Sequence, residues 1–329
     1  MKKILSLITL LLTLTGCISY KELNDIGIIN AIGIDYKDNT YMLTISMFSG
    51  DLENEDQTSI YKTTSSNIED CFNKIYNTST KKAYLAHTNL LILSNNIAKE
   101  NYIDIFNMFL NRPDSRNSFN IVILEDYNEK IFETDTSDIN NLLKINSEEA
   151  SIIKEITLDE VIRDVLEMNM SYIPILKNNK KLEIVGYKSI YEDNKQLDLE
   201  ESLALNFIRN DINKALITIN NINYQINNSS TTLLINKNNI DIKINTNLLL
   251  FDETYNTDQY LNEYKQYIKT IINNFIFNNK LNYFYNKIYK YDYKYYIKNQ
   301  TPNINFNINI DLTINKNNNI KGSDYFDSK

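Results

Sequence analysis

Apolar residues at every second position near the C-terminus constrain the fold more than any other feature of the sequence. Between residues 303 and 315 the even-numbered positions are apolar and the odd-numbered ones carry Asn, Asp or Thr; the apolar set is Ile304, Phe306, Ile308, Ile310, Leu312 and Ile314. Strict alternation gives a β-strand one apolar and one polar face. We therefore predict a β-strand here, and it is the clearest strand in the sequence.

A second alternating region lies near the start of the chain. One face of its first run carries Ile26, Ile28, Ile32, Ile34 and Tyr36, and one face of its second run carries Tyr41, Leu43, Ile45 and Met47. The residues between the two runs, Asp38 and Asn39, are typical of a tight turn. The pattern predicts a β-hairpin.

Helical patterns then alternate with short apolar runs. A capping-box pattern at Ser66 and Glu69 precedes a helix whose apolar face includes Cys71, and a second capping box is expected at Thr157 and Glu160. Between them, strands are predicted at 89–94 and 119–124 with a helix at 96–111, an order that suggests a right-handed crossover. Pro174 interrupts the helical rhythm, and a boundary is placed after it.

The remaining chain gives a strand at 182–191, a turn at 192–195, a helix at 198–209, alternating runs from 215 that include 240–244, and one long helix at 258–289. We predict an α+β fold of two to three mixed α/β domains with largely antiparallel sheets and a long helix in the C-terminal domain. The expected divisions are a lipoprotein signal peptide at 1–16, an N-terminal α+β domain at 17–178, a small strand-turn-helix unit at 179–214, and a C-terminal α+β domain at 215–329.

The N-terminus carries a short apolar run that ends at a cysteine. Lys2 and Lys3 precede the eleven residues 4–14, which are too few for a transmembrane helix of about 20 residues and suit a signal peptide. The sequence Leu14-Thr15-Gly16-Cys17 resembles a bacterial lipobox, so we expect Cys17 to carry a diacylglyceryl group after cleavage before it. The other interpretation is an ordinary secretory signal, with Cys17 a free thiol.

Charge and cysteine content exclude several classes of function. The chain of 329 residues has a formal net charge of −8, which becomes −10 when residues 1–16 and their two lysines are removed. An acidic protein of this kind is not expected to bind nucleic acid or to attach to anionic lipid through basic residues. With Cys17 lipidated, the second cysteine, Cys71, has no partner for an intramolecular disulfide.

Candidate catalytic and metal-binding residues are few. His87 is the single histidine of the sequence, and it is expected to be a strand-edge residue rather than part of a triad or a zinc site. The carboxylates of residues 51–56 lack the spacing of a calcium loop, and no phosphate-binding glycine motif occurs. We therefore predict no enzyme activity, no metal and no cofactor.

The loop at 111–118 is a candidate interaction site. Arg112 and Arg116 stand on either side of Asp114, between a predicted helix and a predicted strand. A guanidinium can hold a carboxylate through two hydrogen bonds, so the loop could contact a partner or a ligand. A local ion pair that fixes a surface loop is the alternative.

These motifs together resemble the Ger(x)C family of spore germination lipoproteins, the C subunits of nutrient germinant receptors. The residues that carry the resemblance are Cys17, the step Lys21-Glu22-Leu23-Asn24, the strand ending Gly33-Ile34-Asp35, and the loop Arg112-Pro113-Asp114-Ser115-Arg116. It extends over residues 14–125 and includes the strand, turn and helix of 182–208. Beyond residue 215 the pattern of elements alone supports it.

The resemblance implies a non-catalytic lipoprotein on the outer face of the spore inner membrane. It would act with membrane-embedded receptor subunits when a small nutrient triggers germination. Two other classes remain as alternatives: a solute-binding lipoprotein that delivers a ligand to a transporter, expected to have two doubly wound lobes, and a hydrolase that acts on the spore cortex.

Overall fold

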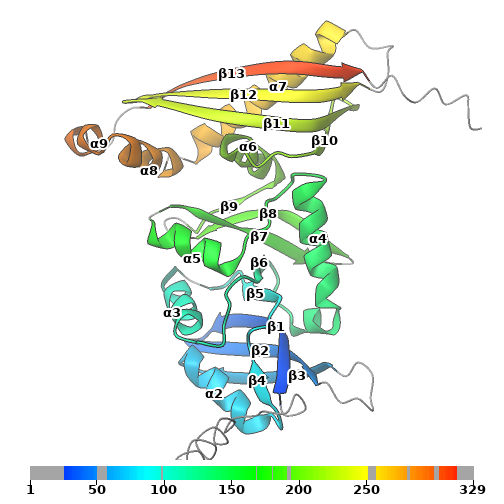
Figure 1. Ribbon diagram of the computed structural model, residues 1–329, viewed down its shortest axis with the longest axis vertical. Helices are drawn as coiled ribbons and strands as arrows, with labels where there is room; N and C mark the ends of the chain where they lie inside the picture. Colours follow the sequence, from blue (N-terminus) through cyan, green and yellow to red (C-terminus); the bar gives the residue numbers. More distant parts are fainter. Residues whose placement is uncertain are drawn as a thin grey trace, which may run out of the picture.

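The chain folds into two β-sheets with helices packed against them (Figure 1). The structure is a computed structural model, and it describes residues 26–49, 58–97, 99–167, 169–179, 181–190, 194–250, 257–279, 282–299 and 304–316. The expected signal peptide, Cys17 and the carboxylates of 51–56 lie outside these residues, as does part of the expected turn at 192–195.

The larger sheet has the strand order β3-β2-β1-β5-β6-β7-β8-β9, with β4 beside β1. Its strands are β1 (Ile26–Lys37), β2 (Thr40–Ser49), β3 (Thr58–Ser65), β4 (Lys82–Tyr84), β5 (Leu90–Ser94), β6 (Asn120–Leu124), β7 (Ser171–Asn178), β8 (Leu182–Ile190) and β9 (Gln196–Leu197). The central pairs β1–β5, β5–β6 and β6–β7 are parallel, and the outer pairs along this order are antiparallel. The expected mixed α/β fold is confirmed, with a parallel centre in a sheet expected to be largely antiparallel.

Helices cover both faces of this sheet. They are α2 (Ile68–Thr78), α3 (Lys99–Leu110), the 3-10 helix η2 (Glu129–Glu133), α4 (Thr136–Glu148) and α5 (Leu158–Leu166). In Figure 1, α2, α3 and α5 lie on one side of the sheet and α4 on the other. The buried side chains of α2, α3 and α5 share one core, and those of η2 and α4 belong to a second core.

The second sheet has the order β10-β11-β12-β13. Its strands are β10 (Ala215–Ile219), β11 (Ile222–Asn236), β12 (Asn239–Leu250) and β13 (Asn305–Lys316), and β13 runs parallel to β12. The helices α7 (Thr257–Asn278), α8 (Asn282–Tyr291) and α9 (Tyr293–Asn299) form the connection between them. The strand expected from the alternation at 304–314 is therefore confirmed as β13.

One helix and one core join the two sheets. Helix α6 (Leu199–Arg209) lies between them in Figure 1, and its buried residues, including Leu205 and Phe207, belong to the core that also contains residues of α4 and of the second sheet. The larger sheet continues across residue 178 through β8 and β9. The domain divisions at 178 and 214 stay proposals.

Two of three local expectations are wrong. A β-bulge between Ile29 and Ala31 shifts the register of β1, so Ile29 and Ala31 are fully buried whereas Ile28 is half-buried, and no single alternating face runs along the strand. The N-cap of α2 is Asn67, whose side chain accepts a hydrogen bond from the Glu69 amide at 2.8 Å, in place of Ser66. The capping box at Thr157 and Glu160 is confirmed.

The long helix expected at 258–289 is divided into α7 and α8. A continuous helix of that length would extend about 48 Å, beyond the roughly 40 Å of a strand such as β13. The break instead lets both helices pack on the sheet, because Phe275 of α7 and Phe284 of α8 are each buried and Phe284 contacts Phe306 of β13 edge-on at 4.8 Å between ring centroids. Packing of both helices against the sheet therefore accounts for two helices where the sequence predicts one.

Candidate functional site

The loop at 111–118 is fixed through one of its two arginines. The Arg112 guanidinium lies over the Phe72 ring, 4.5 Å from its centroid, and its Nη1 donates a hydrogen bond to the Tyr76 hydroxyl at 3.1 Å. Both aromatic residues belong to α2, so Arg112 fastens the loop to that helix. Among the ion pairs of the described residues, none joins Asp114 to Arg112 or Arg116.

Asp114 and Arg116 remain accessible beside this anchor. Arg116 is exposed and Asp114 is half-buried, and the turn is closed by a bond from the Ser115 amide to the Arg112 carbonyl at 3.1 Å. Their charges are therefore presented on the surface by a loop whose position Arg112 sets. This geometry suits contact with another molecule, and an interaction role for the loop stays a proposal.

The Gly33-Ile34-Asp35 motif lies in the buried centre of β1. A β-carbon at Gly33 would lie 2.5 Å from Cζ of Phe132 and would also overlap the Tyr127 hydroxyl, so no side chain fits there. Asp35 is 6% exposed, and its Oδ1 accepts a hydrogen bond from the Tyr36 amide at 2.9 Å. The motif is explained by packing between β1 and the segment that contains η2.

The other sequence candidates lie apart from one another. His87 is exposed in the turn before β5, with its ring 6.0 Å from that of Tyr84. Cys71 is fully buried in α2, its Sγ lies 3.6 Å from the Tyr41 carbonyl, and burial raises the pKa of its thiol. Cys71 is therefore a core residue, as expected, and a buried thiol of raised pKa makes a poor nucleophile.

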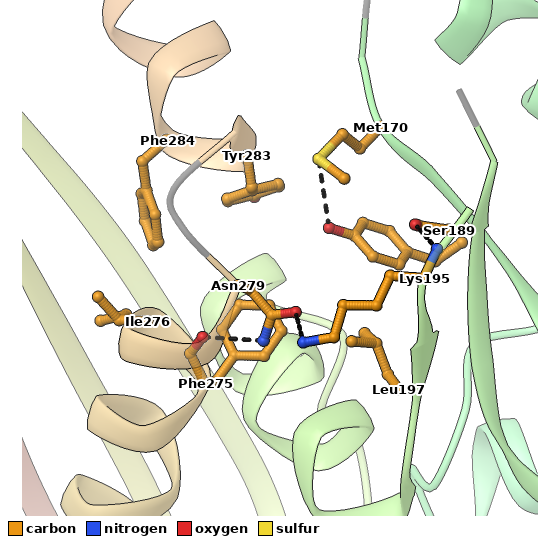
Figure 2. Close-up of a pocket in the computed structure, with 10 residues that line it drawn as sticks. Met170, Ser189, Lys195, Leu197, Phe275, Ile276, Asn279, Tyr283 and Phe284 are labelled. Carbon is orange, nitrogen blue, oxygen red and sulfur yellow. Dashed lines mark hydrogen bonds between the residues drawn. The ribbon is translucent and has the colours of Figure 1, made fainter. Parts of the chain in front are cut away.

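A joint between the larger sheet and the C-terminal helices surrounds Lys195 (Figure 2). Its Nζ donates to Oδ1 of Asn279 at 2.7 Å and lies 3.5 Å from Oε1 of Glu201. Asn279 in turn donates through Nδ2 to the Phe275 carbonyl at 2.8 Å, at the end of α7. The space left among these side chains is about 10 Å³, room for roughly one water molecule. This region is a packed joint between β8, β9 and the helices α7 and α8.

A larger cavity of about 210 Å³ lies next to this joint and shares Met170 and Tyr283 with it. Its charged lining comes from four separate segments: Lys154, Asp164, Arg209 with Asp211, and Lys287. Arg209 is the last residue of α6, Asp164 belongs to α5 and Lys287 to α8. This cluster was not found by sequence analysis, because its charges come from four separate segments that only the fold brings together.

The ion pairs within this cavity share one carboxylate. Nε of Arg209 lies 3.2 Å from Oδ2 of Asp211, and Nζ of Lys154 lies 3.5 Å from Oδ1 of the same side chain. The side chain of Arg209 is 20% exposed and that of Asp211 is 15% exposed. The pKa of the Lys287 ammonium is lowered, first by burial and then by the positive charges of Lys290 and Arg209. The cavity therefore has a positive wall.

Two further cavities are lined mainly by polar side chains at the far end of the larger sheet. One, of about 430 Å³, lies beside β2 and the segment 132–136, and the other, of about 360 Å³, lies beside the start of α2. Within the described ranges no group of His, Cys, Asp and Glu is arranged to hold a metal ion. No helix in the described part of the chain is both long and apolar enough to cross a membrane.

Two family models match the N-terminal part of the chain. Residues 19–178 match the family described as the spore germination protein N-terminal domain, and residues 1–17 match the prokaryotic membrane lipoprotein lipid attachment site. Spore germination protein KC of Bacillus subtilis (strain 168) is 24% identical over 213 residues, covering 59% of this chain and 50% of that protein. The similarity thus spans about half the length of this relative.

A solved structure shares the fold over most of the chain. The crystal structure of the GerBC protein superimposes with a TM-score of 0.56 at 15% sequence identity, covering 86% of this chain and 96% of that one. At this level of identity the likeness concerns the fold alone. It extends beyond residue 178, where the family match ends.

Proposed function

We propose, from the premise that this chain belongs through its N-terminal domain to the Ger(x)C family of spore germination lipoproteins, that it is the lipid-anchored, non-catalytic C subunit of a nutrient germinant receptor. The observation that carries the proposal is the order of the two matches: a lipid attachment site at 1–17 leads directly into the germination domain at 19–178. In this proposal the protein is held at the outer face of the spore inner membrane beside membrane-embedded subunits, and together they respond to a small nutrient.

The proposed lipid anchor raises the local concentration of the protein at the membrane. Two acyl chains on Cys17 hold a protein stably at a bilayer, because each buried CH₂ contributes ~0.8 kcal/mol. A protein confined to the membrane meets its partners at a much higher effective concentration than a free one. The charges of the half-buried Asp114 and the exposed Arg116 are the surface we propose for such a contact.

The alternative of a solute-binding lipoprotein would call for two doubly wound lobes. In the described residues the second sheet is an antiparallel run, β10-β11-β12, with one parallel strand added at its edge. This architecture favours the receptor-subunit proposal.

The test removes the anchor and keeps the fold. Cys17→Ala should leave thermal unfolding of the domains unchanged, release the protein from spore inner membranes and reduce germination with single nutrients. Cys71→Ala is the matched control, because it removes the other cysteine and should leave the protein at the membrane. If Cys17→Ala protein still sediments with membranes after a high-salt wash and spores germinate normally, the anchor assignment is wrong.

Two further measurements address the remaining parts of the proposal. The anchored protein should co-purify with other receptor subunits from spore inner membranes, and its absence from such complexes would contradict the subunit role. Incubation with peptidoglycan should give no turnover, and measurable release of sugar or peptide would contradict the non-catalytic role.

A further inference from the structure

The cavity of about 210 Å³ between α5, α6 and α8 holds more cationic groups than its own carboxylates neutralise. Among the residues that the structure describes, Asp211 is the one carboxylate that its cations contact, and it pairs with both Arg209 and Lys154. For Lys287, no described carboxylate lies within ion-pair distance; its ammonium instead lies 5.5 Å from the centroid of the Tyr283 ring. Two cationic groups, the mostly buried Arg209 and the exposed Lys287, therefore line the cavity with spare donors.

Only some of the N–H donors of the Arg209 guanidinium have partners among the described residues. Its Nε faces Asp211 at 3.2 Å, and its Cζ lies 5.7 Å from the centroid of the Tyr172 ring. No described acceptor bonds its two Nη groups, whose paired N–H donors match a carboxylate in geometry. The Arg209 side chain is 20% exposed and lines the cavity, so these donors can bond a molecule that enters it.

Asp164 of α5 adds a second carboxylate to the lining of the same cavity. Its carboxylate affects the pKa values of Arg209 and Lys287 through charge alone, and it forms no ion pair with a described residue. A molecule that fits the cavity would therefore meet both cationic donors and a carboxylate acceptor.

We propose that this cavity binds a small organic molecule that carries one carboxylate together with an amine or hydroxyl group. The carboxylate lies against the Nη groups of Arg209 and the ammonium of Lys287, and the donor group faces Asp164. A phosphate dianion is disfavoured, because the two aspartates leave the lining with a net charge of only about +1. This proposal does not rest on the receptor role, since it concerns binding by the purified protein.

Binding at this place would join parts of the chain that are distant in sequence. Arg209 ends α6, Asp164 belongs to α5 and Lys287 to α8, so a bound molecule bridges the larger sheet and the C-terminal helices. The joint around Lys195 and Asn279 lies directly beside it. We therefore expect binding to raise the thermal stability of the whole protein.

The experiment uses the mature protein in detergent and four probes: glycine, glycolate, ethanolamine and inorganic phosphate, measured by calorimetric titration and thermal shift. Glycine and glycolate should bind, and ethanolamine, which lacks the carboxylate, should not. Lys287→Met should weaken binding of both carboxylates by about tenfold, because it removes one charged contact. Lys298→Met, an exposed lysine of α9 outside the cavity, is the matched control and should leave binding unchanged.

Two more variants assign the ends of the molecule. Arg209→Lys keeps the charge but loses the paired donors, so it should also weaken binding about tenfold if the protein folds. Asp164→Asn should weaken glycine more than glycolate, since glycine carries the cationic donor. The proposal is overturned if neither carboxylate binds at tens of millimolar, if phosphate alone binds, or if Lys287→Met binds as tightly as the unaltered protein.

Discussion

Asn206 connects helix α6, which lies between the two sheets, to the larger sheet through buried hydrogen bonds. It lies in α6, is 1% exposed, and its Oδ1 accepts a hydrogen bond from the Tyr187 hydroxyl at 2.8 Å. Its Nδ2 donates to the carbonyls of Ser151 at 2.9 Å and Ile152 at 3.1 Å. The Tyr187 hydroxyl also accepts a hydrogen bond from the Lys154 amide.

The size of the effect follows from the number of bonds lost. Asn206→Ala removes three hydrogen bonds worth ~1 kcal/mol each and leaves buried carbonyls without a donor, so the free energy of unfolding should fall by about 3–5 kcal/mol. For a chain of 329 residues that corresponds to a drop in Tm of about 4–7 °C. Tyr187→Phe should cost about 2–3 kcal/mol, since it also leaves the Lys154 amide without an acceptor.

The assay is a double-mutant cycle read by calorimetry and urea unfolding. Because both single variants remove the same Tyr187–Asn206 bond, the double variant should be more stable than the sum of the single losses by about 1–2 kcal/mol. Hydrogen exchange at the Lys154 amide should accelerate in Tyr187→Phe. The exposed Asn213→Ala, in the segment after α6, is the control and should change Tm by less than ~1 °C. Additive losses, or an Asn206→Ala protein as stable as the unaltered one, would refute the reasoning.

Three further predictions concern the larger sheet and its loop. Gly33→Val should lower the free energy of unfolding by at least about 1–3 kcal/mol, because its β-carbon would overlap the aromatic ring packed above it, and an unchanged Tm would contradict this. Arg112→Lys should cost roughly 1 kcal/mol through the lost hydrogen bond and ring contact with α2, whereas Arg116→Lys, the matched change in the same loop, should be neutral by thermal unfolding. The hydrogen bond to Lys177 lowers the pKa of Glu125, so this pair adds stability above the ordinary Glu range and loses it as the pH falls through the lowered value. Lys177→Met should therefore destabilise the protein near neutral pH but not near pH ~3, and equal losses in urea unfolding at both pH values would exclude this role.

The elements that the sequence predicted correctly are those with strong local signals. The alternation in β13 and the turn residues Asp38 and Asn39 of the first hairpin are such signals, and neither needs knowledge of neighbouring elements. The capping box at Thr157 and Glu160 works in the same way, because its bonds close within four residues. Such signals survive folding because tertiary packing reinforces them.

The elements that were predicted wrongly depend on partners elsewhere. The bulge in β1 lets Ile29 and Ala31 both reach buried positions, which a regular strand would place on one face only. The break between α7 and α8 exists because Phe284 packs against Phe306 of a strand that follows in the chain. Neither the bulge in β1 nor the break between α7 and α8 can be predicted from the periodicity of the segment itself.

The binding properties of the charged cavity likewise cannot be predicted from local sequence patterns. A formal net charge of −8 suggests a protein that repels anions, and at long range it does. At the cavity, however, the potential is set by charges within a few ångströms, and there α6 and α8 bring Arg209 and Lys287 together while Asp211 is already occupied. Screening by salt removes most of the effect of distant acidic residues, over about 8–10 Å, so the local arrangement decides what can bind. An acidic chain can therefore hold a carboxylate, provided the fold brings together more cationic donors than the neighbouring carboxylates occupy.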